Sequence, residues 1–235
     1  MRKISNNTMI AGALIATMGT TSVFAMDNEF RDGYYFGGSL GKAVSRTKPS
    51  GSNIDILQKA TIIPNAGATF KVDYKNADSF GLLGGYKMGD IRYEADFKHS
   101  KHKLGRLNEH LANGTVQDFS DFVEEVSIQY KNIAFSAYRD FKGDSSIIPY
   151  AGAGVGIGRF KSRAKFIGPL NSPATISNTK LTGQLVGGVR LPITSGFHLS
   201  ADYRYFSTIG KVGAIDKRFS NHSINLGFLF QPRFL

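Results

Sequence analysis

Apolar and polar side chains alternate through residues 80–98, which read FGLLGGYKMGDIRYEADFK, and the alternation is interrupted only at a Gly-Asp pair. A side-chain period of two indicates β-strands, and the short Gly89-Asp90 turn predicts an antiparallel hairpin. In the second strand one face is wholly apolar, and the other carries charges of both signs. The apolar face is Ile91, Tyr93, Ala95 and Phe97; the charged face is Arg92, Glu94, Asp96 and Lys98.

The same period recurs along the chain and predicts eight strands. They cover residues 34–44, 80–88, 91–98, 123–138, 148–160, 180–191, 197–206 and 222–230. Residues 69–74 could add a short strand. The phase of the fourth strand changes near Lys131-Asn132, which predicts a bulge there. A patch at 107–111 has weak helical character.

The connections between these strands alternate between long and short. The long ones are residues 45–77, 99–121, 161–178 and 207–220. A soluble sheet exposes its charged face to water, and nothing in such a sheet requires long and short connections to alternate. A membrane barrel turns its apolar face to lipid, and its short turns lie on the periplasmic side. The pattern therefore favours an all-β, eight-stranded antiparallel transmembrane β-barrel with four long extracellular loops and three short periplasmic turns.

The N-terminus supports an exported protein. Residues 1–25 combine two basic residues, a short apolar run and small residues before Ala25, as a cleaved secretory signal does. The alternative is an uncleaved anchor. Cleavage after Ala25 leaves residues 26–235 as the barrel domain, with a net charge of +9 once Arg2 and Lys3 are gone from the +11 total. No later stretch approaches the ~20 apolar residues of a transmembrane helix.

Three segments resemble the OmpA-like outer-membrane barrel superfamily: GGYKMGDIRYEADF (84–97), IPYAGAGVGIG (148–158) and ADYRYF (201–206). Within it they are most similar to the surface-antigen family of obligate intracellular alphaproteobacteria. The resemblance implies an abundant surface protein that faces the host, and an adhesin or small pore. It also implies contact with outer-membrane lipids and with lipopolysaccharide where present. Barrel-assembly machinery would read a C-terminal aromatic residue, either Phe230 or Phe234.

A barrel of this kind would carry many charges inside. The expected interior network is Arg92, Glu94, Asp96, Lys98, Arg190, Asp202 and Arg204. Buried charges must pair, because an unpaired one is very costly. A lumen of eight strands is just filled by side chains, so we favour a polar plug over an ion path. Alternate glycines in 148–160 would leave room for these groups, and no helix follows them to form a dinucleotide loop.

Two sets of residues superficially suggest chemistry. His198, Ser200 and Asp202 share one strand face, but alternate residues lie ~6.5–7 Å apart, too far for a nucleophile–base hydrogen bond. We interpret them as part of the plug. The histidines at positions 99, 102 and 110 could bind a metal or haem, but they lack carboxylates at matched spacing. The absence of Cys excludes thiolate sites and a cysteine nucleophile. We predict no catalytic residue, metal or cofactor.

The third long loop carries the sharper surface signal. Lys161, Arg163 and Lys165 lie in a stretch without Asp or Glu. They could form a solvated rim that pairs with lipopolysaccharide phosphates, or attract acidic host glycans or a host receptor; nucleic acid is not expected for an exported barrel. The leading interpretation is a non-enzymatic surface antigen and host-cell adhesin. The alternatives are a small porin and, less favoured, a lipid-modifying outer-membrane enzyme.

Overall fold

The computed structural model describes residues 30–45, 50–51, 69–118, 123–143, 145–166, 173–212 and 217–232, and the structural statements below refer to these. The predicted signal at residues 1–25, its cleavage site after Ala25, and Phe234 lie outside the described residues. None of the described residues forms a helix that is long and apolar enough to cross a membrane.

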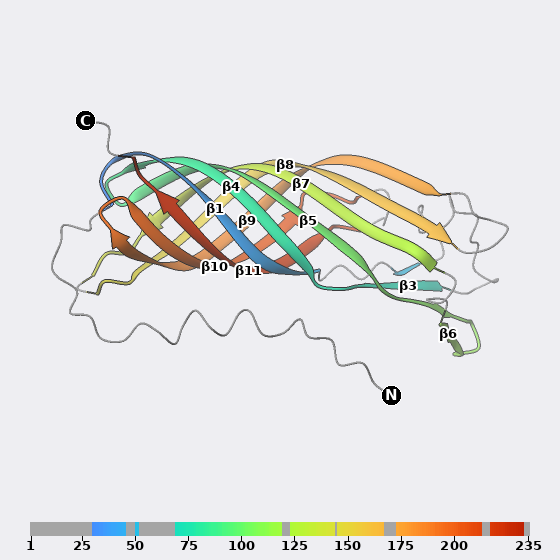
Figure 1. Ribbon diagram of the computed structural model, residues 1–235. Helices are drawn as coiled ribbons and strands as arrows, with labels where there is room; N and C mark the ends of the chain where they lie inside the picture. The colour runs from blue at the N-terminus through green and yellow to red at the C-terminus, as the bar shows by residue number, and fades with distance from the viewer. Residues whose placement is uncertain are drawn as a thin grey trace.

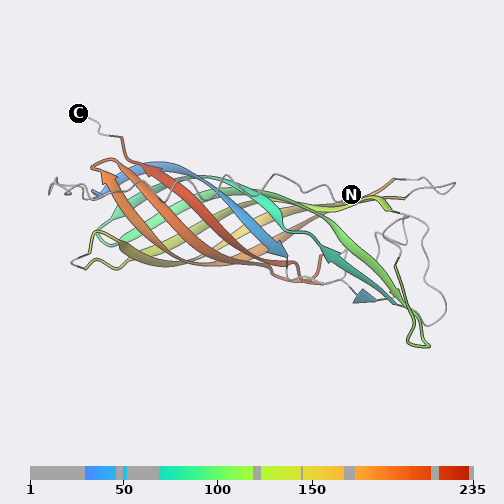
Figure 2. The same ribbon diagram turned by 60° about the horizontal axis from the view of Figure 1, so that its bottom comes forward.

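Eight strands of the described chain pair in a closed antiparallel ring (Figures 1 and 2). They are β1 (Gly33–Ser45), β4 (Ala77–Met88), β5 (Ile91–His110), β7 (Val123–Asp140), β8 (Ile148–Phe166), β9 (Ala174–Thr194), β10 (Phe197–Thr208) and β11 (Ser220–Phe230). Each pairs with the next, and β1 pairs with β11 to close the ring. Closure removes the free sheet edges where the strands form the ring, although residues 174–181 of β9 extend beyond β10 and pair with β8 alone. The ring agrees with the predicted all-β barrel.

An apolar belt surrounds the barrel. Its exposed members include Tyr34, Phe36, Leu40, Phe80, Leu82, Tyr86, Tyr93, Ile133, Phe135, Val155, Ile157, Leu181, Leu185, Tyr203, Ile224, Leu226, Phe228 and Phe230. Aromatic pairs such as Tyr34–Tyr86, with ring centroids 4.9 Å apart, lie at one margin of the belt. A water-soluble monomer rarely exposes so large a contiguous apolar surface, whereas a membrane barrel presents it to lipid.

One end of the barrel, here called the turn end, holds two tight turns and both ends of the described chain. Gly89 has φ +60°, a left-handed conformation that suits glycine, and the paired residues Met88 and Ile91 flank the turn. The Gln231 side chain accepts from the Arg31 backbone N–H at 3.0 Å and donates to the Arg31 carbonyl at 2.8 Å. The predicted hairpin is therefore present, and it lies beside the joined ends of the barrel.

The opposite end, here called the tall end, rises on strands where long loops were predicted. β5 continues to His110, and β8 continues to Phe166 before β9 begins at Ala174. Strands therefore cover residues 161–166 and 174–178 of the expected loop at 161–178, and Lys161, Arg163 and Lys165 lie on β8. The prediction that these three residues form a loop is wrong. All three pair with β7, and Lys161 and Arg163 also pair with β9, which holds them on a regular strand.

Three further strands join the tall end: β2 (Ser50–Gly51), β3 (Thr69–Tyr74) and β6 (Val116–Asp118). β3, expected as a short strand, pairs with the end of β5 (Figure 1). A bulge lies there, because Asp73 opposes Arg106 while Tyr74 opposes Leu104. The helical patch predicted at 107–111 is wrong, since the bulge shifts the apolar phase and gives the leucines a spacing that imitates a helix.

The bulge predicted near Lys131-Asn132 is also wrong. β5 and β7 pair in continuous register there, and the β7–β8 irregularity lies at Val123/Glu125 instead. The apolar side chains of β7 move from the outer face to the inner face of the strand because the strand leaves the apolar belt. Within the belt, Ile133 faces outward toward lipid, whereas above it Tyr130 points inward and is 4% exposed. An apolar core consequently fills the tall end of the lumen.

Candidate functional site

The structure places all seven residues of the expected interior network inside the barrel, and each is at most 9% exposed. β5 supplies Arg92, Glu94, Asp96 and Lys98; β9 supplies Arg190; β10 supplies Asp202 and Arg204. They lie inside because the period of two on each strand alternates lipid-facing and lumen-facing positions. The seven residues divide into two groups along the barrel axis.

The group nearer the turn end is organised by Asp140. This carboxylate accepts from Arg92 Nε at 3.0 Å and from Arg190 Nη2 at 2.5 Å. Arg92 also lies 2.5 Å from the Glu94 carboxylate, which accepts a second hydrogen bond from the Tyr35 hydroxyl at 2.9 Å. Two cations and two anions therefore neutralise one another in a space from which water is nearly excluded.

The second group lies nearer the middle of the barrel. Arg204 Nη1 is 3.1 Å from Asp96 Oδ1 and donates to Gln184 Oε1 at 2.9 Å. The Gln184 amide in turn donates to Asp96 at 2.9 Å. Asp202 accepts from Asn225 at 2.8 Å. Lys98 differs, because its short contact of 2.7 Å is to the Ser39 hydroxyl rather than to a carboxylate.

Sequence reasoning missed several members of this network. Asp140 lies beyond the predicted strand 123–138, yet it is the last residue of β7 and only 1% exposed. The signal was available, because Asp140 continues the inward parity of Ser136 and Tyr138. Tyr35, Gln184 and Asn225 share inward faces too, but their roles depend on which strands face one another across the lumen.

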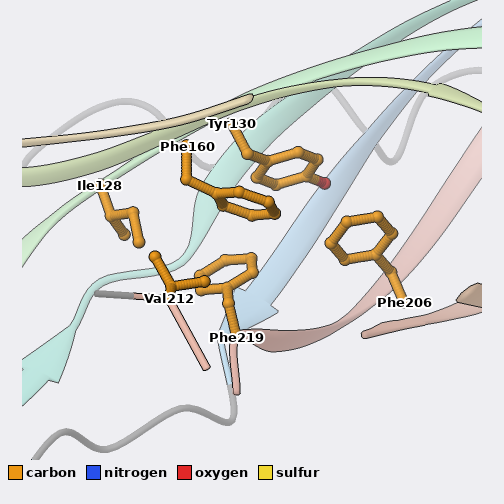
Figure 3. Close-up of a cluster of buried hydrophobic side chains, with 6 residues drawn as sticks. All are labelled: Ile128, Tyr130, Phe160, Phe206, Val212 and Phe219. Atoms are coloured by element: carbon orange, nitrogen blue, oxygen red, sulfur yellow. The ribbon is translucent and has the colours of Figure 1, made fainter. Parts of the chain in front are cut away.

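Both ends of the lumen are closed. At the turn end the Phe30 ring packs edge-on against Tyr35 at 4.9 Å and His198 at 4.6 Å, with the Arg190 guanidinium 4.5 Å above it. At the tall end the apolar core is made of Ile128, Tyr130, Phe160, Phe206, Val212 and Phe219 (Figure 3). The cavity between the charged groups has a volume of about 20 Å³, enough for roughly one water. The described side chains thus form a plug.

The residues that resembled a hydrolase triad do not interact as one. Among the described residues, neither ring nitrogen of His198 has a hydrogen-bond partner, and its ring packs on Phe30. Among the three histidines of the expected second loop, His102 points into the apolar core and stacks on Tyr130, while His99 faces the other side of β5. In the part of the chain that the structure describes, no three metal-ligating side chains gather.

The outer surface of the tall end is basic. Its exposed or half-exposed cations include Lys101 and Lys103 on β5 and Lys161, Arg163 and Lys165 on β8, and these five residues are here called the basic collar. Two acidic residues partly balance them: Lys101 lies 2.6 Å from Glu125, and Lys165 lies 2.7 Å from Glu124. The hydrogen bond from Lys101 lowers the pKa of Glu125. An open polar groove of about 640 Å³ lies between Lys101, Lys103 and the two glutamates.

Solved structures share this fold. Neisserial surface protein A superposes with a TM-score of 0.53 at 20% identity, covering 85% of this chain and 97% of that one. The outer membrane protein OprG from Pseudomonas aeruginosa superposes at 0.51 with 14% identity, covering 87% and 99%. No curated protein matches the chain. The family described as outer membrane protein beta-barrel domain matches residues 11–231. That match covers the whole ring of strands, and the chain belongs to this family of bacterial outer-membrane barrels.

Proposed function

We propose that this protein is a non-enzymatic surface protein that attaches the bacterium to acidic glycans of a host cell through the basic collar. The observation that carries the proposal is the collar itself, which rises above the apolar belt on regular strands. In outer-membrane barrels the short turns face the periplasm and the longer connections face outward. The tall end, with the collar, would then face the host.

The chemistry of the collar suits sulfated or carboxylated sugars. Clustered cations raise the local concentration of an anionic ligand, and a guanidinium such as that of Arg163 can donate two parallel hydrogen bonds to one anion. The ion pairs with Glu124 and Glu125 are partly exposed, so each contributes little stability. A polyanion could displace these carboxylates at low cost, and the mature net charge of +9 favours its approach.

The test is binding of the full-length protein, displayed on cells, to host cells and to immobilised heparin. Replacing Lys161, Arg163 and Lys165 by Gln should weaken binding by about tenfold or more, which corresponds to about 1.4 kcal/mol. Binding should also fall as salt rises, because exposed charges are screened. A charge-matched comparison sets Arg163→Gln/Lys165→Gln against Arg139→Gln/Lys142→Gln at the turn end. Binding that does not weaken as salt rises, or that is unchanged in the collar variants, contradicts the proposal.

Two other functions, a small porin and a lipid-modifying enzyme, can each be distinguished from the proposed adhesin by a separate assay. A small porin requires a water path, and the closed lumen argues against one. Reproducible conductance of the wild-type protein in planar bilayers would overturn the plug and favour the porin. A lipid-modifying enzyme would change lipid A in a manner that Ser200→Ala abolishes. Lipid A that is identical with and without the protein supports the non-enzymatic role.

We also propose that the chain is cleaved after Ala25 and is closest to the surface antigens of obligate intracellular alphaproteobacteria. The signal-like N-terminus and the three resembling segments support this. Assembly machinery would recognise Phe230 or Phe234 as the terminal aromatic residue. Intact-mass analysis of the membrane form tests the cleavage, and separate Phe230→Ala and Phe234→Ala variants test the assembly signal by the yield of folded barrel.

A further inference from the structure

Two cations face each other where the apolar belt meets the basic collar. Lys131 on β7 is directly opposite Arg159 on β8 in the register, and both side chains are exposed. None of the ion pairs among the described residues includes either side chain. Like charges directly opposite each other destabilise a sheet. This pair therefore creates a site where a bound anion would relieve repulsion.

An apolar groove of about 660 Å³ runs down the outer wall from the same two residues. It is lined by Phe97 on β5, Ile133 and Phe135 on β7, and Val155 and Ile157 on β8. The small side chain of Ala95 lies between these larger neighbours and leaves the groove open. Apart from Lys131, Arg159 and Thr179 at its upper end, its lining is apolar.

We propose that this groove binds one anionic phospholipid of the surrounding leaflet. An acyl chain lies along the apolar groove, and the phosphate accepts hydrogen bonds from Lys131 Nζ and the Arg159 guanidinium. Only a molecule with an anionic head directly above an apolar chain matches both halves of the site. A guanidinium binds phosphate oxygens in a bidentate manner, and the ammonium adds a point charge. The bound phosphate would also replace the repulsion between Lys131 and Arg159 by two attractive contacts.

This site is distinct from the basic collar in the residues that it uses, although both rest on the tall end facing outward. The test is native mass spectrometry of the full-length barrel released from nanodiscs that contain equal amounts of phosphatidylglycerol and phosphatidylcholine. The wild type should retain one phosphatidylglycerol in preference to phosphatidylcholine by about tenfold. Lys131→Gln/Arg159→Gln should lose that preference, and Ala95→Leu, which fills the groove, should lower retention with all charges intact.

The control is Lys161→Gln/Arg163→Gln, which removes the same charge from the collar above the site. It should keep the retained lipid but lose host-cell binding, whereas Lys131→Gln/Arg159→Gln should show the reverse. The two proposals can therefore fail separately. Equal retention of both lipids, or equal loss in both double variants, overturns the site and indicates an ordinary lipid annulus. If Ala95→Leu retains as much phosphatidylglycerol as the wild type, the acyl chain does not lie in the groove.

Stability supplies a second readout that does not depend on lipid surviving release. In a nonionic detergent, Lys131→Gln/Arg159→Gln should unfold at a urea concentration equal to or above that of the wild type, because repulsion is gone. In phosphatidylglycerol vesicles the order should reverse, since a ligand that binds only the folded state stabilises it. The same order in both media contradicts the proposal.

Discussion

The clearest consequence of the plug is the expected effect of Asp140→Asn. The Asp140 carboxylate is 0% exposed and holds two guanidiniums, one through each oxygen. The substitution keeps the shape of the side chain and its backbone hydrogen bond to Asp90 at 2.8 Å. What it removes is the negative charge between Arg92 and Arg190.

The magnitude follows from the burial of both cations. Breaking a buried ion pair by removing one partner costs about 3–5 kcal/mol, mostly because the remaining charge is buried without compensation. Glu94 still neutralises Arg92, so Arg190 carries most of the loss. Replacing Arg190 by Met in the Asp140→Asn background removes the orphaned charge. The double variant should therefore recover about 1–3 kcal/mol relative to the sum of the single variants.

The assay is urea unfolding of the full chain in lipid vesicles, with a heat-shift gel to confirm that each variant starts folded. Glu125→Gln is the matched control, because it also removes one carboxylate from a pair, but that pair is more than one-third exposed. We expect it to cost under about 1 kcal/mol. If Asp140→Asn costs no more than Glu125→Gln, water reaches the lumen and the plug argument is refuted.

Three further changes probe the packing and the closures. Gly154→Val should destabilise the barrel by about 1–3 kcal/mol in the same urea assay, because its Cβ would overlap the Ser136 hydroxyl, whereas Gly187→Ala, which meets nothing, should be nearly neutral. Phe30→Ala should cost about 3 kcal/mol yet leave planar bilayers non-conducting, because the apolar core still closes the tall end; a conducting variant would contradict that closure. Burial lowers the pKa of His102, so the unfolded chain binds the proton first and stability is lost as pH falls below the ordinary value of 6.5. The protection factors for hydrogen exchange at the tall end, which correct for the slower intrinsic exchange at low pH, should therefore fall from pH 7 to 5 in the wild type and much less in His102→Phe.

Within the belt, the faces of the strands could be predicted because two constraints act together. Lipid demands apolar groups outside, and the narrow lumen demands small or polar groups inside. A strand such as β11 therefore displays Ile224, Leu226 and Phe228 outward without ambiguity. Parity alone does not reveal which interior groups meet. Arg92 and Arg190 lie on strands separated by β7 and β8, and the barrel's stagger brings both to Asp140.

At the tall end, the alternation of apolar residues did not predict which strand face points inward, because the surroundings on both sides of the strand change there. Above the belt, water replaces lipid outside, so charges such as Lys131 face outward. Inside, apolar rings replace the ion pairs, so Tyr130 and Phe160 face inward and stack with centroids 6.2 Å apart. The period of two persists while its apolar face inverts. A sequence pattern in which apolar residues switch parity without a turn signal therefore indicates a strand that leaves the membrane.

That inversion also decides where the protein can act. A lumen filled by ion pairs and capped at the tall end by an apolar core offers no room for a substrate larger than about one water. On the described part of the barrel, a larger ligand would then have to bind the outer wall. Along β8 the wall passes from Ile157, which faces lipid, through Arg159 at the boundary, to Arg163 in the collar. One strand thus presents three chemistries in succession: an apolar surface, a cation at the boundary, and the basic collar.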